Sequence, residues 1–171
     1  SDLGCPWCYV GWAALKAAVR RRPDLAVHVA WRPFLLHPDL PPEGIERGPY
    51  IAAMTANDPE RIQKSSETLR DIAANLDVPL NLSAPQRVPN TVNAHRLIHW
   101  AAGQGSAEVV IDALFTAYWV DGADLGDTEL LVAWAATAGF DGPLVAELLA
   151  SDADPDVIHT QHAAAVAIGM R

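Results

Sequence analysis

Only one stretch of this 171-residue chain alternates large apolar side chains with small or polar ones, at residues 25–32. This period of two predicts a β-strand. From about residue 48 onward, apolar residues instead recur at helical spacing, between Asp-Pro, Ser and Gly positions that start and stop helices. A single strand cannot form a stable sheet. We therefore expect a mostly α-helical chain with one clear strand at 25–32, truncated at both ends, so that further strands precede and follow it.

The composition excludes several classes of protein. Apolar residues make up 50% of the chain and charged residues 19%, which is enough apolar material for a packed core. With 12 Lys and Arg against 21 Asp and Glu, the net charge of −9 argues against binding to nucleic acid or to an anionic membrane. No run approaches the roughly 18 apolar residues of a membrane span. No signal peptide is visible, and we expect a cytoplasmic protein.

The residues Cys5-Pro6-Trp7-Cys8 carry the strongest chemical signal. Pro6 suits the first position of a helix, so the pattern predicts a helix over 5–22 with Cys5 at its N-cap. Unpaired backbone N–H groups and the helix dipole stabilise a thiolate there, and such motifs lower a cysteine pKa from about 8.5 to roughly 3.5–7.5. Cys8 follows one turn later. We expect Cys5 to attack a disulfide or thiol partner and Cys8 to resolve the mixed disulfide.

Other uses of a C-x-x-C pair stay open at this point. Two cysteines are also half of a zinc site, and two further ligands would complete it. Histidine pairs at helical spacing could supply them, namely His95 with His99 and His159 with His162. A cysteine and histidine metal-binding domain is therefore an alternative, although Pro6 and Trp7 leave no tight metal-binding turn. We expect no metal in the site.

Beyond these residues, the chain resembles the DsbA superfamily of thioredoxin-fold proteins, and within it the FrnE-like thiol–disulfide oxidoreductases. The resemblance covers nearly the whole chain in order, which makes it far more specific than the C-x-x-C alone. The segments that carry it are Cys5–Tyr9, Trp31–Phe34, Leu36–Pro38, Leu40–Gly44, Asn90–Thr91, Ala94–Leu97, Ala117–Trp119 with Asp127, and Ala167–Gly169.

This resemblance implies an α/β thioredoxin-like fold with a large helical insertion. Residues 1–44 would form a partial thioredoxin-like domain with the helix 5–22 and the strand 25–32. Residues 45–165 would form the helical insertion, and 166–171 the return to the first domain. A strand would precede Ser1, and a cis-proline segment would follow Arg171. The implied activity is thiol–disulfide exchange with proteins or small thiols, without a bound cofactor and with glutathione as a candidate co-substrate.

Relatives in the same superfamily suggest a second function. Kappa-class glutathione transferases and 2-hydroxychromene-2-carboxylate isomerases generally carry serine where this chain has Cys5, and a serine cannot exchange disulfides. A glutathione-dependent isomerase or transferase acting on a small aromatic or polyketide-like molecule is therefore the alternative enzyme. For either enzyme, the candidate groove residues are Pro6, Trp7 and His95. His95 also fits a simpler role as a partly buried polar residue of its helix.

Overall fold

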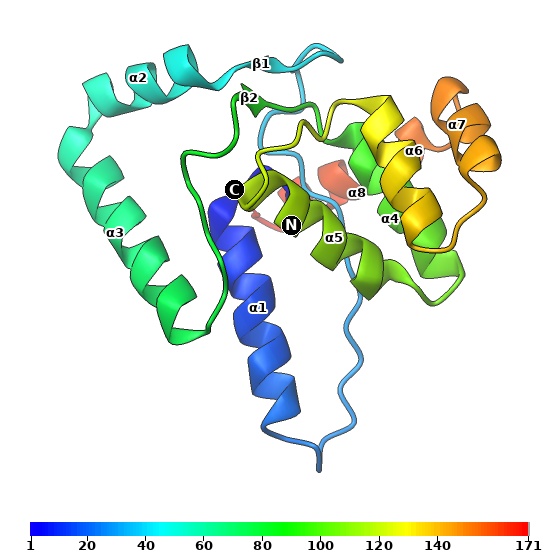
Figure 1. Cartoon of the computed structure of the whole chain (residues 1–171), viewed down its shortest axis with the longest axis horizontal. Coiled ribbons are helices and arrows are strands. Elements are labelled where there is room, and N and C mark those ends of the chain that lie inside the picture. The colour runs from blue at the N-terminus through cyan, green and yellow to red at the C-terminus, as the bar shows by residue number, and fades with distance from the viewer. Residues whose placement is uncertain (171) are drawn as a thin grey trace.

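The computed structural model describes residues 1–170, which form eight helices and two short strands (Figure 1). Arg171, the end of the predicted segment 166–171, lies outside the described residues. The strands β1 (Ile45–Glu46) and β2 (Arg87–Val88) pair antiparallel. The helices are α1 (Pro6–Arg20), α2 (Arg47–Asn57), α3 (Pro59–Asn75), α4 (Val92–Gly103), α5 (Ala107–Trp119), α6 (Thr128–Thr137), α7 (Gly142–Ala150) and α8 (Pro155–Ala167). This confirms the mostly helical fold. None of the described helices is both long and apolar enough to cross a membrane.

Aspartate caps set the start of several helices. Asp58 accepts a hydrogen bond from the Arg61 N–H (3.1 Å) at the start of α3. Asp127 accepts from the N–H groups of Glu129 and Leu130 at the start of α6. Such side chains satisfy backbone donors that have no partner within the helix. Because this chemistry is local, these helix starts are readable from sequence.

The predicted strand at 25–32 is wrong, because these residues form irregular chain that returns alongside α1 (Figure 1). A strand exists only through hydrogen bonds to a neighbouring strand, and within residues 1–170 no strand lies beside it. At its start, the Leu25 N–H donates to the Arg22 carbonyl at 3.0 Å, which closes the turn after α1. At its end, the Ser1 amino group donates to the Arg32 carbonyl and the Phe34 N–H donates to the Ser1 carbonyl, both at 2.9 Å. The alternation is real, but its apolar side chains remain 43–49% exposed, namely Leu25, Val27 and Val29.

An aromatic cluster fixes the position of α1. Tyr9 stacks on Phe115 of α5, with ring centroids 5.3 Å apart. Trp31 meets Phe115 edge-on at 5.8 Å and Trp12 edge-on at 5.9 Å. Aromatic pairs at these separations stabilise beyond the apolar area that they bury. The helix that begins at the cysteines is therefore held against the central helix α5.

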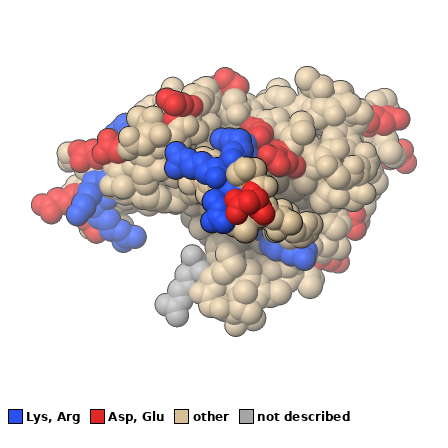
Figure 2. Space-filling model, turned by 90° about the horizontal axis from the view of Figure 1, so that it is seen from below, with Lys and Arg blue, Asp and Glu red and all other residues tan. Residues whose placement is uncertain are grey.

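The far end of α1 carries charge. Arg20 lies in its last turn and Arg21 is its C-cap, where cations are favoured by the helix dipole. Arg22 pairs with Asp24 at 2.6 Å in the turn that follows. Figure 2 looks at this end of the molecule and shows Lys and Arg gathered near the middle of the face. The three consecutive arginines, Arg20–Arg22, are thus explained by the end of a helix.

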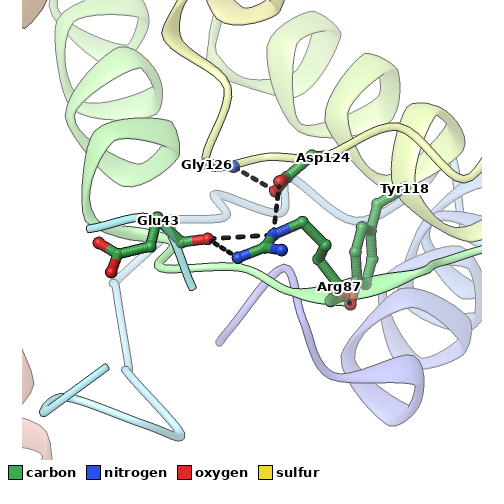
Figure 3. A network of polar contacts seen from close by, with 5 residues as sticks. All are labelled: Glu43, Arg87, Tyr118, Asp124 and Gly126. Carbon is green, nitrogen blue, oxygen red and sulfur yellow. Dashed lines mark hydrogen bonds and ion pairs between the residues drawn. The ribbon is translucent and has the colours of Figure 1, made fainter. Parts of the chain in front are cut away.

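A polar network around Arg87 holds the small sheet against α5 (Figure 3). The Arg87 guanidinium donates to the Glu43 carbonyl and pairs with Asp124 at 3.2 Å. The Arg87 carbonyl accepts a hydrogen bond from the Tyr118 hydroxyl at 2.8 Å, and Asp124 also accepts from the Gly126 N–H. One side chain thereby joins the segment before β1, the strand β2 and the loop after α5.

Candidate active site

Cys5 occupies the N-cap of α1 and Pro6 its first helical position, as the sequence predicts. The Cys5 carbonyl accepts from the N–H groups of Cys8 (3.0 Å) and Tyr9 (3.2 Å), which starts the helix. The Cys5 N–H donates to the Asp2 carbonyl at 3.2 Å, which closes the turn in front of the helix. The Cys5 side chain therefore lies at the helix end where backbone donors are unpaired.

The two cysteines are free thiols and both are half-buried, so exposure does not distinguish Cys5 from Cys8. A hydrogen bond between the two thiols is the largest cause of both pKa shifts. It lowers the pKa of Cys8 to about 6 and, together with burial, raises that of Cys5. The backbone N–H groups of Trp7 and Cys8 act on Cys5 in the opposite direction, toward a lower pKa. The two thiols are therefore coupled, and a thiolate on one sulfur is favoured by the proton that the other sulfur keeps.

An exposed tryptophan of α1 and a tyrosine of α2 contribute to the surroundings of Cys5. Trp7 is 44% exposed beside it. The pKa of Tyr50, on α2, is raised mainly by burial and further by Cys5, which places the phenol within electrostatic reach of the thiol. His37 Nε2 lies 3.1 Å from the Tyr50 hydroxyl, and the two rings meet edge-on. No local pattern in the sequence marks Tyr50 or His37, because only the fold brings Tyr50 within electrostatic reach of Cys5 and His37 against Tyr50.

Cys8 also faces a separate space. A cavity of about 360 Å³ lies between α1 and residues 29–32, and its lining includes Cys8, Gly11, Trp12 and Trp31. The lining is chiefly apolar. Cys5 is not part of it, so the two sulfurs have different surroundings although their overall burial is similar.

Of the predicted groove residues, Pro6 and Trp7 lie at the cysteines, whereas His95 lies in the interior. Its side chain is only 1% exposed, so it does not face solvent from a groove. Burial lowers the pKa of His95 to about 4, while the nearby Asp2 opposes this shift. Asp2 itself is 4% exposed. The structure thus places a buried acid and a buried histidine behind the turn that carries Cys5.

The histidines do not join the cysteines in a ligand cluster. Across residues 1–170, no group of three or more His, Cys, Asp or Glu side chains is arranged to hold a metal ion. His162 instead accepts a hydrogen bond at Nδ1 from the Leu35 N–H, at 3.1 Å. The residues present therefore do not support the alternative of a metal-binding domain.

Known proteins resemble this chain in sequence. A family model described as the DSBA-like thioredoxin domain matches residues 1–171. The uncharacterized protein YwbO of Bacillus subtilis (strain 168) is 28% identical over 142 residues, which are 83% of this chain and 65% of YwbO. The chain thus spans 65% of the length of this curated relative.

Two solved structures share the fold. A probable DsbA oxidoreductase from Streptomyces coelicolor gives a TM-score of 0.86 at 29% identity, over 99% of this chain and 74% of the other. A 2-hydroxychromene-2-carboxylate isomerase gives a TM-score of 0.70 at 15% identity, over 99% of this chain and 78% of the other. With a family model that covers the whole sequence, the chain belongs to the family of DSBA-like thioredoxin domains.

Proposed function

We propose that the protein is a thiol–disulfide oxidoreductase of the FrnE-like type that works through Cys5 and Cys8. The observation that carries this proposal is the pair of free thiols in the first turn of α1, with Cys5 at the N-cap, and their coupling lowers the pKa of Cys8 to about 6. A thiolate is the reactive form in disulfide exchange, and this pair holds one at neutral pH. The likeness to a probable DsbA oxidoreductase supports the same activity.

The shared proton gives both cysteines a role. When the proton passes from Cys5 to Cys8 along their hydrogen bond, Cys5 becomes the thiolate at the helix N-terminus. It attacks a substrate disulfide, forms a mixed disulfide and releases the first substrate thiolate. Cys8 then loses its proton and attacks the Cys5 sulfur, which releases the second substrate thiolate. The substrate disulfide is reduced and the protein dithiol becomes a disulfide, while one released thiolate takes the proton of Cys8 and the other takes a proton from water.

The surroundings of Cys5 suit substrates with an apolar group beside the sulfur. Trp7 is exposed next to Cys5, and Tyr50 with His37 adds a phenol and an imidazole nearby. We propose thiol- or disulfide-containing proteins and small thiols as partners, with glutathione as a candidate co-substrate. The reverse of the reaction above would oxidise such partners, and the redox buffer selects the direction.

Replacing each cysteine in turn tests this assignment. Cys5→Ser should abolish disulfide exchange, because a hydroxyl group forms no mixed disulfide. Cys8→Ser should accumulate a covalent complex with a disulfide substrate, because attack proceeds and resolution does not. A non-reducing gel distinguishes the two results. Accumulation of the complex by the Cys5 variant and not by the Cys8 variant would reverse the two roles.

The same two variants address the alternative enzyme. The fold shared with a 2-hydroxychromene-2-carboxylate isomerase makes glutathione-dependent isomerisation of a small aromatic molecule the second candidate. That reaction needs no exchange between two sulfurs of the protein. If both variants retained full activity on such a substrate, and the unaltered protein exchanged no disulfides, the isomerase would replace the oxidoreductase.

A further inference from the structure

The carboxylate of Asp2 is buried and accepts three hydrogen bonds. Oδ1 accepts from the Gly4 N–H and from the Thr91 hydroxyl, both at 3.0 Å, and Oδ2 accepts from the Leu36 N–H at 2.7 Å. Asp2 is 4% exposed and Thr91 is 5% exposed. Buried carboxylates are costly unless such donors compensate them. One side chain thus joins three distant segments: the turn before α1, the chain at Leu36 and the start of α4.

Asp2 also builds the turn that presents Cys5. Its carbonyl accepts from the Cys5 N–H at 3.2 Å, and its Oδ1 accepts from the Gly4 N–H. An aspartate that bonds the backbone two residues ahead stabilises a tight turn. Between these two bonds, the Leu3 carbonyl accepts from the Trp119 indole N–H at 3.0 Å. The turn is therefore held at both ends by Asp2 and in the middle by α5.

The backbone of the same residue also influences the second cysteine. Among the causes that lower the pKa of Cys8, the Asp2 backbone follows the Cys5 thiol and Ser1. The titratable groups that face Asp2 are the Ser1 amino group, His95 of α4 and Tyr118 of α5. Asp2 thus influences both cysteines. It holds the turn before Cys5 and contributes to the lowered pKa of Cys8.

We propose that Asp2 is a positioning residue for the dithiol, whose anchored carboxylate sets the turn that places Cys5 at the helix N-terminus. The proposal rests on the proposed function, because positioning matters only if these sulfurs react. Its immediate consequence is a property of the thiols themselves, which is measurable without any substrate. Loosening the turn should remove part of the stabilisation of the thiolate.

The test is the pH profile of alkylation of the reduced protein by iodoacetamide. In Asp2→Asn, one oxygen becomes an NH2 group, so a donor faces the Leu36 N–H or the donors at Oδ1. We expect alkylation near pH 6 to slow by about three- to fivefold, with the profile displaced to higher pH, since helix-end effects on a charge have about this size. Loss of the negative charge of Asp2 acts in the opposite direction, so Thr91→Val, which keeps that charge, is measured beside it. The matched control is Asp127→Asn, which alters an aspartate that also accepts two backbone N–H bonds but caps α6 instead. Its profile should equal that of the unaltered protein.

Unfolding curves recorded on the same variants separate positioning from simple structural support. A folded Asp2→Asn protein that is less stable but keeps the unaltered alkylation profile would overturn the proposal. Should Asp2→Asn fail to fold, Thr91→Val decides, because it removes one bond to Oδ1 and keeps the charge. It should shift the profile in the same direction by about twofold, and an unchanged profile overturns the proposal. Failure of the unaltered protein to exchange disulfides would instead refute the proposed function and leave the alkylation result standing.

Discussion

His95 is the side chain whose charge state should matter most for stability. It is 1% exposed, and neither ring nitrogen has a hydrogen-bond partner within residues 1–170. Burial lowers its pKa to about 4, below the value near 6.5 of an unfolded chain. A histidine whose pKa is lower in the folded protein is protonated preferentially after unfolding. The stability is therefore complete above about pH 6.5 and is lost as the pH falls toward 4.

This predicts the pH dependence of unfolding by urea. Between pH 6.5 and 4, the free energy of unfolding should fall by up to about 1.4 kcal/mol per pH unit from His95 alone. His95→Leu should remove that part of the slope, while His28→Leu, at an exposed position, should leave it unchanged. Equal slopes in the unaltered protein and His95→Leu would show that His95 does not titrate in this range.

The candidate site could be predicted from sequence only where it is contiguous. Cys5, Pro6 and Cys8 were predicted at the start of a helix because capping and the C-x-x-C spacing are local properties. Tyr50 lies far along the chain and reaches Cys5 only through the placement of α2, so no local pattern marks it. His95 was predicted to line a groove, and helical spacing alone could not show that its face of α4 is the buried one.

At the scale of secondary structure, helices depend on local sequence, whereas strands depend on a distant partner. Several helices begin at an aspartate, such as Asp58 and Asp127, whose side chain caps the first turn and so marks the start of the helix locally. The strand predicted at 25–32 is wrong because a β-strand needs a second strand to pair with. The sequence shows the alternation of one segment but not whether a partner lies beside it. The two strands that do form, β1 and β2, are two residues long and carry no alternation to detect.

The C-terminal end of α7 depends on a buried arginine from α4. Arg96 is 3% exposed and donates to four carbonyl groups, those of Leu148, Leu149, Ser151 and Ala153. The last carbonyls of a helix have no partner within it, so the guanidinium supplies donors to them. Leu148 also accepts from the N–H and hydroxyl of Ser151. The five N–H donors of a guanidinium lie in one plane and can reach several carbonyls at once. A lysine has its three donors on a single nitrogen and cannot reach all four carbonyls.

Arg96→Lys should therefore lower the free energy of unfolding by about 2–4 kcal/mol, because several carbonyls lose their donors while the charge stays. Chemical denaturation measures this change. Arg61→Lys, the same substitution at an exposed position of α3, should have almost no effect. Similar losses in the two variants would mean that the hydrogen bonds of Arg96 add nothing beyond those of a surface arginine.

For the whole molecule, the question is how the helix with the cysteines is attached to the helical array. Aromatic contacts of Tyr9 and Trp31 with Phe115 supply the apolar part of this attachment. The polar part is Asp112 of α5, which accepts from the Trp12 indole N–H at 2.6 Å and pairs with Lys16 at 2.5 Å. These partners are about 100 positions apart in sequence, so only the resemblance to a known family, and no local pattern, could anticipate the attachment.

A double-mutant cycle on Lys16→Ala and Asp112→Ala should isolate the ion pair of this attachment from the indole bond. The side chains are 23% and 42% exposed, so solvent screens part of the attraction, and we expect a coupling of about 0.5–1 kcal/mol that weakens with added salt. The matched pair is Arg22 with Asp24, equally close but 58% and 60% exposed within one turn, where we expect no measurable coupling. Equal coupling in the two cycles would contradict the prediction. A larger, salt-sensitive value for Lys16 with Asp112 would establish that charge, as well as aromatic packing, fastens the cysteine-bearing helix to α5.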